Sequence, residues 1–405
     1  MRSEWEIAQR LDQLLSGVAE KVRPLPSLAP DDAPKERARL IACLSRGEVP
    51  VPAPSARRPP VERGIFRVLD EARRLSGECS FGALYVGRLD ELELDLAILD
   101  AWGDPKRVRP LCARRYGRGD EPAQTALGEV PLGVLAEQLL RKLPREPAQD
   151  RPLPAASRRP SEPSVARLAL RAAHGVGLDP TVRVEPRLAS LAATGERTVF
   201  LSDRMFSLRE ARRLVAHEVF GHLVVAANAR AQPLRLLQIG LRGAFADQEG
   251  VSLYLEAALG LMCSERLRTL AARVVATQLL HQGVSFGETA RTLHDVYGVS
   301  AEVAILTSER TFRGGGVARD AGYLAGFLRV RAAISAGHAT LDELRAGRVA
   351  LEHVEILRDL VRRGFVRAPV YRPSLAVSRS LTFGGTSAET SPPSDAASLT
   401  MLELT

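Results

Sequence analysis

The stretch SLREARRLVAHEVFGH, residues 207–222, holds the most informative pattern in this chain of 405 residues. Ser207 followed three residues later by Glu210 is a capping box, which predicts that a helix begins at Ser207. The same helix is expected to continue through the two histidines at the end of the stretch.

Two histidines and a glutamate on this helix indicate a metal site. His217, Glu218 and His222 follow one another within six positions. Neutral imidazoles are the commonest zinc ligands, and a glutamate beside the first histidine can act as general base on a metal-bound water.

The spacing of the two histidines is unusual for such a site. His217 and His222 are five residues apart, which places them roughly 140° apart around a regular α-helix. Either the helix contains a one-residue π-bulge that restores a shared face, or the histidines are unrelated and the motif is accidental. Gly221 favours the bulge, because glycine lets the backbone deform beside the second histidine.

A third metal ligand is expected from a nearby helix. The segment ADQEGVSLYLEAAL, residues 246–259, contains Glu249 and Glu256. They are seven residues apart and therefore project from nearly the same helix face. Either one binds zinc while the other orients a ligating histidine, or both glutamates face solvent.

The rest of the chain is predicted to be mainly helical. Residues 181–188 and 197–201 are rich in β-formers on either side of a turn at 194–196, which suggests two short strands that could pair as a hairpin. Helices are expected at 4–22, at 164–174, over most of 61–143, and at 246–261, 264–281, 286–296, 299–311, 320–336, 340–346 and 350–363.

Proline-rich stretches divide the chain. They occupy residues 49–60 and 144–163. We therefore expect a mostly helical N-terminal region with Pro-rich linkers over residues 1–150 and a second domain, which contains the candidate metal site, over 160–375. The Ser, Thr and Pro-rich tail, 378–405, is expected to be disordered.

Composition narrows the functional class. The net charge of +8 comes from 56 basic and 48 acidic residues without a long basic run, so we expect a solvated basic surface and no nucleic-acid partner. The four cysteines show no CxxC spacing and are expected to be free thiols. The charged N-terminus is unlike a signal peptide, and no long apolar window suggests a membrane span. A cytoplasmic protein without a membrane partner is expected.

Two longer segments extend the pattern and carry a resemblance to a known family. The strings HEVFGH and QEGV, with residues 228–256 and 311–326 around and after them, resemble the QEGLA-motif family of HExxxH metallopeptidases. That family includes the microtubule-associated tyrosine carboxypeptidases of animals and bacterial proteins, some named as flavohemoglobin-expression modulators. The resemblance covers roughly residues 165–370. The expected fold is α+β and predominantly helical, with a zincin-like catalytic domain whose small sheet lies beside the metal-bearing helix.

The resemblance implies roles for the site residues. One zinc ion would be bound by His217, His222 and Glu249, and Glu218 would be the catalytic base. Glu256 would remain a candidate for orienting a ligating histidine without binding the metal itself. Two departures are visible. Val251 and Ser252 replace the Leu and Ala of QEGLA, and Arg319 replaces a family lysine, which leaves substrate identity open.

The expected function is a zinc carboxypeptidase acting on a peptide or protein C-terminus. A tyrosine or aromatic terminal residue is suggested only by the animal relatives. Tyr323 could stabilise the oxyanion or be a plain core residue, and Arg230, Arg310, Arg313 and Arg319 are candidates for the terminal carboxylate. The alternatives are a zinc endopeptidase or small-amide hydrolase, and a non-catalytic regulatory protein with structural zinc.

Overall fold

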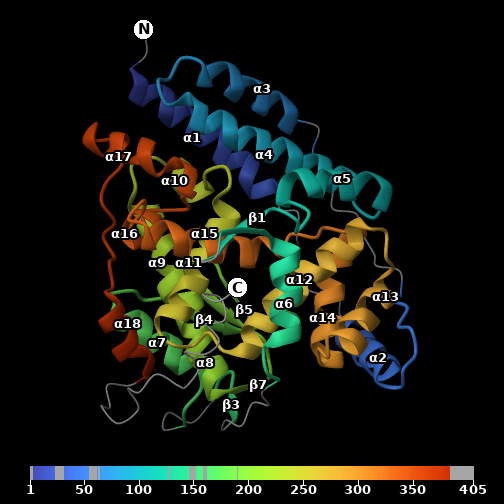
Figure 1. Cartoon of the computed structure of the whole chain (residues 1–405). Coiled ribbons are helices and arrows are strands. Elements are labelled where there is room, and N and C mark those ends of the chain that lie inside the picture. The colour runs from blue at the N-terminus through green and yellow to red at the C-terminus, as the bar shows by residue number, and fades with distance from the viewer. Residues whose placement is uncertain are drawn as a thin grey trace.

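The computed structural model describes residues 3–22, 32–53, 62, 64–125, 128–145, 152–157, 162–188 and 190–383. Most of these residues are helical, and three small sheets complete the fold (Figure 1). The predicted α+β class with helices predominating is confirmed. Its zincin-like character stays a prediction.

Helices run through the whole described chain. The first group is α1 (Glu4–Lys21), α2 (Ala33–Ser45), α3 (Ile65–Ser76), α4 (Gly82–Asp100), α5 (Pro105–Tyr116), α6 (Leu132–Lys142) and α7 (Val165–Gly175). The central group is α8 (Leu208–Leu214), the π-helix η1 (Val215–Leu223), α9 (Val224–Ala231), α10 (Leu236–Ile239), α11 (Ala244–Ala258) and α12 (Ser264–His281). The last group is α13 (Phe286–Arg291), the π-helix η2 (Thr292–Val296), α14 (Ala301–Phe312), the 3-10 turn η3 (Arg313–Gly315), α15 (Ala321–Ser335), α16 (Leu341–Leu344), η4 (Leu351–His353), α17 (Val354–Arg362) and α18 (Leu375–Phe383).

The small sheets are made of very short strands. They are β1 (Pro122–Thr125) with β2 (Gly128–Pro131), β3 (Pro152–Pro154) with β7 (Met205–Ser207), and β4 (Thr181–Val184), β6 (Thr198–Leu201) and β5 (Ala192–Thr194) in that spatial order. The hairpin expected between 181–188 and 197–201 is wrong in its pairing. β4 pairs with β6 in parallel, and the antiparallel partner of β6 is β5. The turn after Thr194 therefore closes a β5–β6 hairpin, and β5 is an edge strand.

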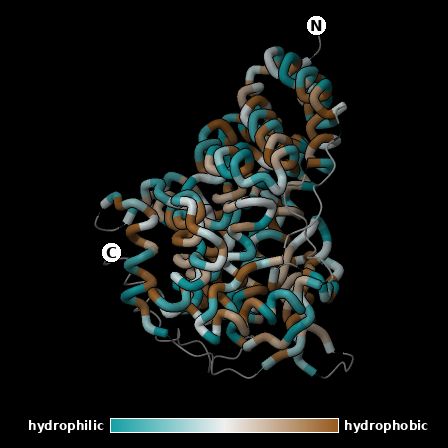
Figure 2. Tube along the Cα trace, turned by 90° about the vertical axis from the view of Figure 1, so that its right-hand side faces the viewer, coloured by the Kyte–Doolittle hydropathy of each residue, from teal (hydrophilic) through white to brown (hydrophobic). Residues whose placement is uncertain are grey.

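Helices α1, α3, α4 and α5 form an N-terminal layer at one end of the molecule, whereas α2 packs against α14 (Figure 1). α1 begins with a capping box formed by Ser3 and Glu6, and it packs beside α3 and α4 (Figure 1). Apolar and polar residues alternate along the helices (Figure 2), as expected when each helix buries one side. The helix expected at 4–22 is thus confirmed.

This layer is joined to the rest of the molecule through Asp12. Its carboxylate accepts the backbone amides of Arg235 and Leu236, at 2.7 and 2.9 Å, and the hydroxyl of Tyr85 at 2.9 Å. The largest core cluster combines residues from Ile7 to Val366. The Pro-rich stretch at 144–163 therefore does not separate two hydrophobic cores.

Parts of the expected linkers and tail are ordered elements. β3 lies inside the stretch 144–163 and pairs with β7, while α18 makes residues 378–383 of the expected disordered tail helical. Residues 54–60 and 384–405 lie outside the described residues. The four cysteines are free, as predicted. Within the described part of the chain, no helix is both long and apolar enough to traverse a bilayer.

Close packing between helices places η1, which carries the two histidines, beside α11, which carries Glu249 and Glu256. α11 packs against both η1 and α15. A Cβ on Gly221 would lie 2.2 Å from Oγ of Ser252, and a Cβ on Gly326 would lie 1.9 Å from the carbonyl oxygen of Ala246. Glycine at these two positions lets η1 and α15 approach α11 from opposite sides.

Candidate metal centre

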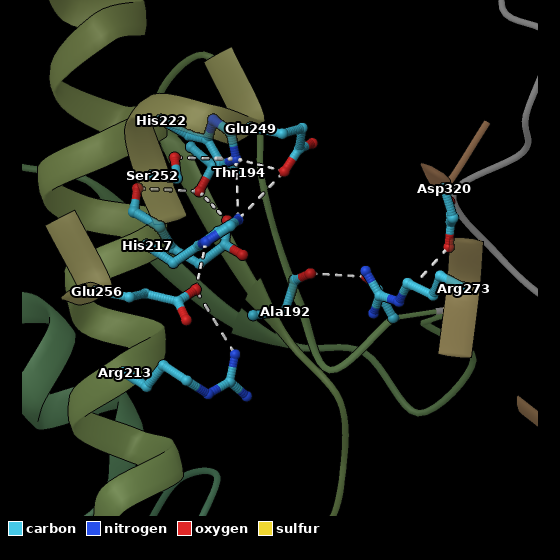
Figure 3. Close-up of polar contacts among 12 residues, drawn as sticks. Ala192, Thr194, Arg213, His217, His222, Glu249, Ser252, Glu256, Arg273 and Asp320 are labelled. Atoms are coloured by element: carbon cyan, nitrogen blue, oxygen red, sulfur yellow. Dashed lines mark hydrogen bonds and ion pairs between the residues drawn. The ribbon is translucent and has the colours of Figure 1, made fainter. Parts of the chain in front are cut away.

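The helix that carries the histidines contains the expected defect. Residues Val215–Leu223 form a π-helix between the α-helical segments α8 and α9. The extra residue per turn brings the two imidazoles to one side, with Nε2 of His217 and Nε2 of His222 3.2 Å apart. Their rings meet edge to face (Figure 3).

Glu249 on α11 completes this cluster. Its Oε2 lies 3.3 Å from Nε2 of His217 and 3.6 Å from Nε2 of His222. Tetrahedral zinc with bonds of about 2.0 to 2.2 Å requires donor atoms about 3.3 to 3.6 Å apart. Oε2 of Glu249 is also shielded from solvent without a hydrogen-bond partner among the described residues. Two imidazole nitrogens and one carboxylate oxygen at these separations fit a zinc ion.

The carboxylates also change the proton affinity of His217. Burial alone would lower the pKa of His217, but the neighbouring carboxylates of Glu249 and Glu256 outweigh it and raise the pKa to about 9. The same imidazoles hold the pKa of Glu249 well below its usual range, although burial would raise it. These carboxylates therefore favour a positive charge at His217 in the metal-free protein.

Glu256 lies behind the histidines and does not join the cluster. It is fully buried, and its Oε1 accepts from Nδ1 of His217 at 2.7 Å. Nε and Nη2 of Arg266 each donate to the same carboxylate at 2.9 Å, and Arg213 lies 3.8 Å away. The two glutamates of α11 therefore divide the expected roles, with Glu249 among the donor atoms and Glu256 orienting His217.

Glu218 faces the cleft beside the cluster. Its Oε2 accepts from Oγ1 of Thr194 on β5 at 2.7 Å. Glu218 is 6% exposed, so its carboxylate is largely shielded from bulk water. Sequence reasoning missed Thr194, because the turn after it signals a hairpin and not a contact with a helix that begins more than ten residues later.

A cleft of about 460 Å³ opens over these residues. Its walls come from β5, η1, α11 and α15, and also from α4 and α5 of the N-terminal layer. Five arginines line it, namely Arg88, Arg115, Arg310, Arg319 and Arg348. The contribution of α4 and α5 was not predictable from spacing, because it depends on how the N-terminal layer packs.

A sequence model described as the microtubule-associated tyrosine carboxypeptidase family matches residues 62–382, well over half of the chain. The chain belongs to this family. No curated protein matches it. The match begins ahead of α3, so it covers the helices that form the cleft wall and reaches further than the resemblance over 165–370. The family name implies a hydrolase of the carboxypeptidase kind.

Two of the arginines expected to bind substrate lie away from the cleft of this family member. The guanidinium of Arg230 on α9 donates to the backbone carbonyl of Glu196. Arg313 begins the turn η3, where burial and nearby Arg310 lower its pKa to about 10. Neither residue lines the cleft. The structure therefore does not support the expectation that they bind substrate.

Arg319 and Arg310 do line the cleft but differ in their partners. Arg310 forms a two-point ion pair with Asp320. The guanidinium of Arg319 lies 4.8 Å from the ring centre of Phe245, and its buried Nε has no hydrogen-bond partner among the described residues. Arg319 is therefore the better placed of the two to receive an anion.

The glycines after Arg313 have a structural role in this family member. Gly314, Gly315 and Gly316 all have positive φ, from 64° to 127°. A Cβ on Gly314 would lie 2.8 Å from the ring of Trp102, and the carbonyl of Gly314 accepts from the amide of Gly103. The run thus packs η3 against the start of α5.

Tyr323 lines the cleft and is also packed. Its ring meets Phe245 edge to face, and the guanidinium of Arg273 lies 4.9 Å from its ring centre. Burial, with the carboxylate of Glu249 nearby, raises the pKa of Tyr323 to about 12. Its hydroxyl is therefore a hydrogen-bond donor at neutral pH.

Proposed function

We propose that this chain is a zinc-dependent carboxypeptidase that removes a C-terminal residue from a peptide or protein. The observation that carries the proposal is the convergence of His217, His222 and Glu249 donor atoms beside Glu218. The family description supports the carboxypeptidase class.

The chemistry assigns a task to each side chain. A zinc ion held by the three ligands would lower the pKa of a bound water to about 7 and polarise the scissile carbonyl. Glu218 takes the proton of the attacking water and returns it to the leaving amine. Thr194 holds the Glu218 carboxylate in position through its hydrogen bond. Tyr323 donates to the developing oxyanion, because its hydroxyl remains protonated.

An extended peptide fits the cleft because β5 is the edge strand of its sheet. Residues Ala192–Thr194 line the cleft, and an edge strand can pair its outward backbone groups with an extended ligand. Arg319 would bind the terminal carboxylate, and the rings of Phe245 and Tyr323 would contact the terminal side chain. Those rings favour an aromatic terminal residue, in agreement with the tyrosine in the family description.

Paired peptides with free and amidated C-termini test the proposal. We expect purified protein with zinc to release one terminal residue from the free peptide and nothing from the amide, with activity lost after chelation. Internal cleavage of both peptides would make the chain an endopeptidase instead.

Replacing the proposed base separates an enzyme from a regulatory zinc protein. Glu218→Gln removes the proton acceptor but none of the ligands, so we expect hydrolysis to fall by about 10²-fold to 10⁴-fold while bound zinc stays stoichiometric. Metal analysis and peptide assays on the same preparation measure both. Absence of hydrolysis in the wild type despite stoichiometric zinc would favour the regulatory alternative.

A further inference from the structure

Two arginines lie beside the buried carboxylate that accepts from Nδ1 of His217. Glu256 is fully buried, with Arg266 in hydrogen-bond contact and Arg213 at 3.8 Å. Neither arginine lines the cleft, so neither is positioned to contact a substrate there.

We infer that Arg266 is a positioning residue for the metal site, acting through Glu256 on the orientation of His217. The inference rests on the proposed zinc site. It adds a residue from α12, a helix that contributes none of the three donor atoms and not the base.

The hydrogen bond to Glu256 selects the tautomer of His217 that can bind a metal through Nε2. Oε1 of Glu256 accepts from Nδ1 of His217 at 2.7 Å and from Nη2 of Arg266 at 2.9 Å. An ionised carboxylate accepts but does not donate, so Nδ1 carries the proton in this contact. The lone pair of Nε2 of the neutral ring then faces His222 and Glu249, where a metal requires it.

Arg266 fixes the plane of that carboxylate. Its Nε and Nη2 each bond a different oxygen of Glu256, which is a planar two-point contact. Such a contact sets direction as well as charge, whereas the guanidinium of Arg213 at 3.8 Å supplies charge alone. Without Arg266, the Glu256 carboxylate could rotate, and Nδ1 of His217 would lose a directed acceptor.

A neighbouring residue on α12 offers a matched control. Arg268 is also buried, but its guanidinium donates to the backbone carbonyls of Leu140, Leu143 and Tyr297 and does not contact Glu256. Replacing Arg268 therefore tests the loss of a buried arginine from α12 without changing the support of His217.

Zinc affinity is the measurement that tests the inference. Folded Arg266→Met and Arg266→Lys proteins are compared with wild type and Arg268→Lys by competition with a chromogenic chelator, and circular dichroism checks folding. We expect Arg266→Met to weaken zinc binding about 10-fold to 100-fold. Arg266→Lys should lie between it and the wild type, because lysine keeps the charge without the planar contact. Arg268→Lys should bind within about twofold of wild type.

Coupling to Glu256 provides a second readout. If Arg266 acts through Glu256, adding Arg266→Met to Glu256→Gln should weaken zinc binding no further than Glu256→Gln alone. The visible spectrum of the cobalt-substituted protein should change in Arg266→Met and not in Arg268→Lys.

The results that would overturn the inference are distinct from those that would overturn the zinc proposal. Wild-type affinity in folded Arg266→Lys and Arg266→Met, or equal losses in Arg266→Lys and Arg268→Lys, would remove the role of Arg266 while leaving the zinc site intact. A wild-type protein that binds no zinc would instead contradict the proposed function. If Arg266→Met does not fold, the lysine pair alone decides the outcome.

Discussion

At the residue scale, the cleft contains several arginines that differ in what already neutralises them. Arg115 is paired with Glu91 and Asp95, while Arg310 is paired with Asp320. Nε of Arg319 lacks a partner among the described residues. The sequence does not rank these candidates, because ion pairs that form only in the folded protein decide which cation remains available.

Arg319→Met should remove recognition of the terminal carboxylate. Because a hydrogen-bonded charge contributes about 1.5 to 3 kcal/mol, we expect kcat/KM on free-acid peptides to fall about 10-fold to 100-fold. Arg230→Met is the control, since Arg230 lies outside the cleft and should leave kcat/KM near that of wild type. Similar losses in both variants would show that Arg319 has no special role.

The raised pKa of His217 predicts how zinc binding depends on pH. With a pKa of about 9, His217 is protonated in the metal-free protein at neutral pH, and zinc must displace that proton. Raising the pH towards 9 therefore favours binding, by about tenfold per pH unit between pH 7 and 8. Chelator competition at the two pH values measures this, and an affinity independent of pH would contradict the raised pKa.

At the element scale, helices were predictable and strand pairing was not. The helix predicted at 264–281 coincides with α12, and the stretch predicted at 286–296 is divided between α13 and η2. Helical periodicity and caps are local signals. The five-residue spacing of the histidines left a π-bulge and an accidental motif as alternatives, and the π-helix η1 agrees with the first. The parallel pairing of β4 with β6 depends on contacts between separated segments, which short strands do not encode.

The crossing of α11 and α15 depends on the absence of a side chain at Gly326. A Cβ there would lie 1.9 Å from a backbone oxygen of Ala246, three positions before Glu249. We expect Gly326→Ala to lower the free energy of unfolding by about 1 to 3 kcal/mol and to weaken zinc binding, because α11 must shift. Denaturant unfolding measures the first effect.

Gly322→Ala is the matched control on the same helix. The nearest atom to a Cβ at Gly322 is 3.5 Å away, an ordinary contact. Alanine is the better helix former, so this variant should be as stable as wild type or slightly more stable. Equal destabilisation by both substitutions would show that the close approach of α11 and α15 is not the cause.

At the scale of the whole molecule, the N-terminal helices α4 and α5 are part of the structure that forms the cleft. α4 and α5 supply part of the cleft wall, Glu91 on α4 accepts the amide of Gly243 ahead of α11, and Asp12 on α1 caps α10. The composition of residues 1–150 predicted their helices but not these contacts, because capping between separate segments leaves no periodic signal.

Asp12 should make stability depend on pH. Burial raises its pKa to about 6, above the ordinary value of 3.8, despite the hydrogen bonds it accepts. A raised folded-state pKa favours the protonated form, so its contribution is present below about pH 4 and is lost as the pH rises through 6. Relative to Asp12→Asn, wild type should lose up to about 3 kcal/mol between pH 4 and pH 7. Denaturant titrations of both proteins across this range measure the difference, and a constant difference would contradict the shift.

The central claim is that the π-helix and α11 hold one metal ion among three side chains. Anomalous diffraction at the zinc absorption edge, on crystals of protein purified with zinc, tests it most directly. We predict one strong peak about 2.0 to 2.2 Å from Nε2 of His217, Nε2 of His222 and Oε2 of Glu249. The absence of a peak between these atoms in zinc-supplied crystals, or a peak bonded to Glu256 instead, would contradict the account.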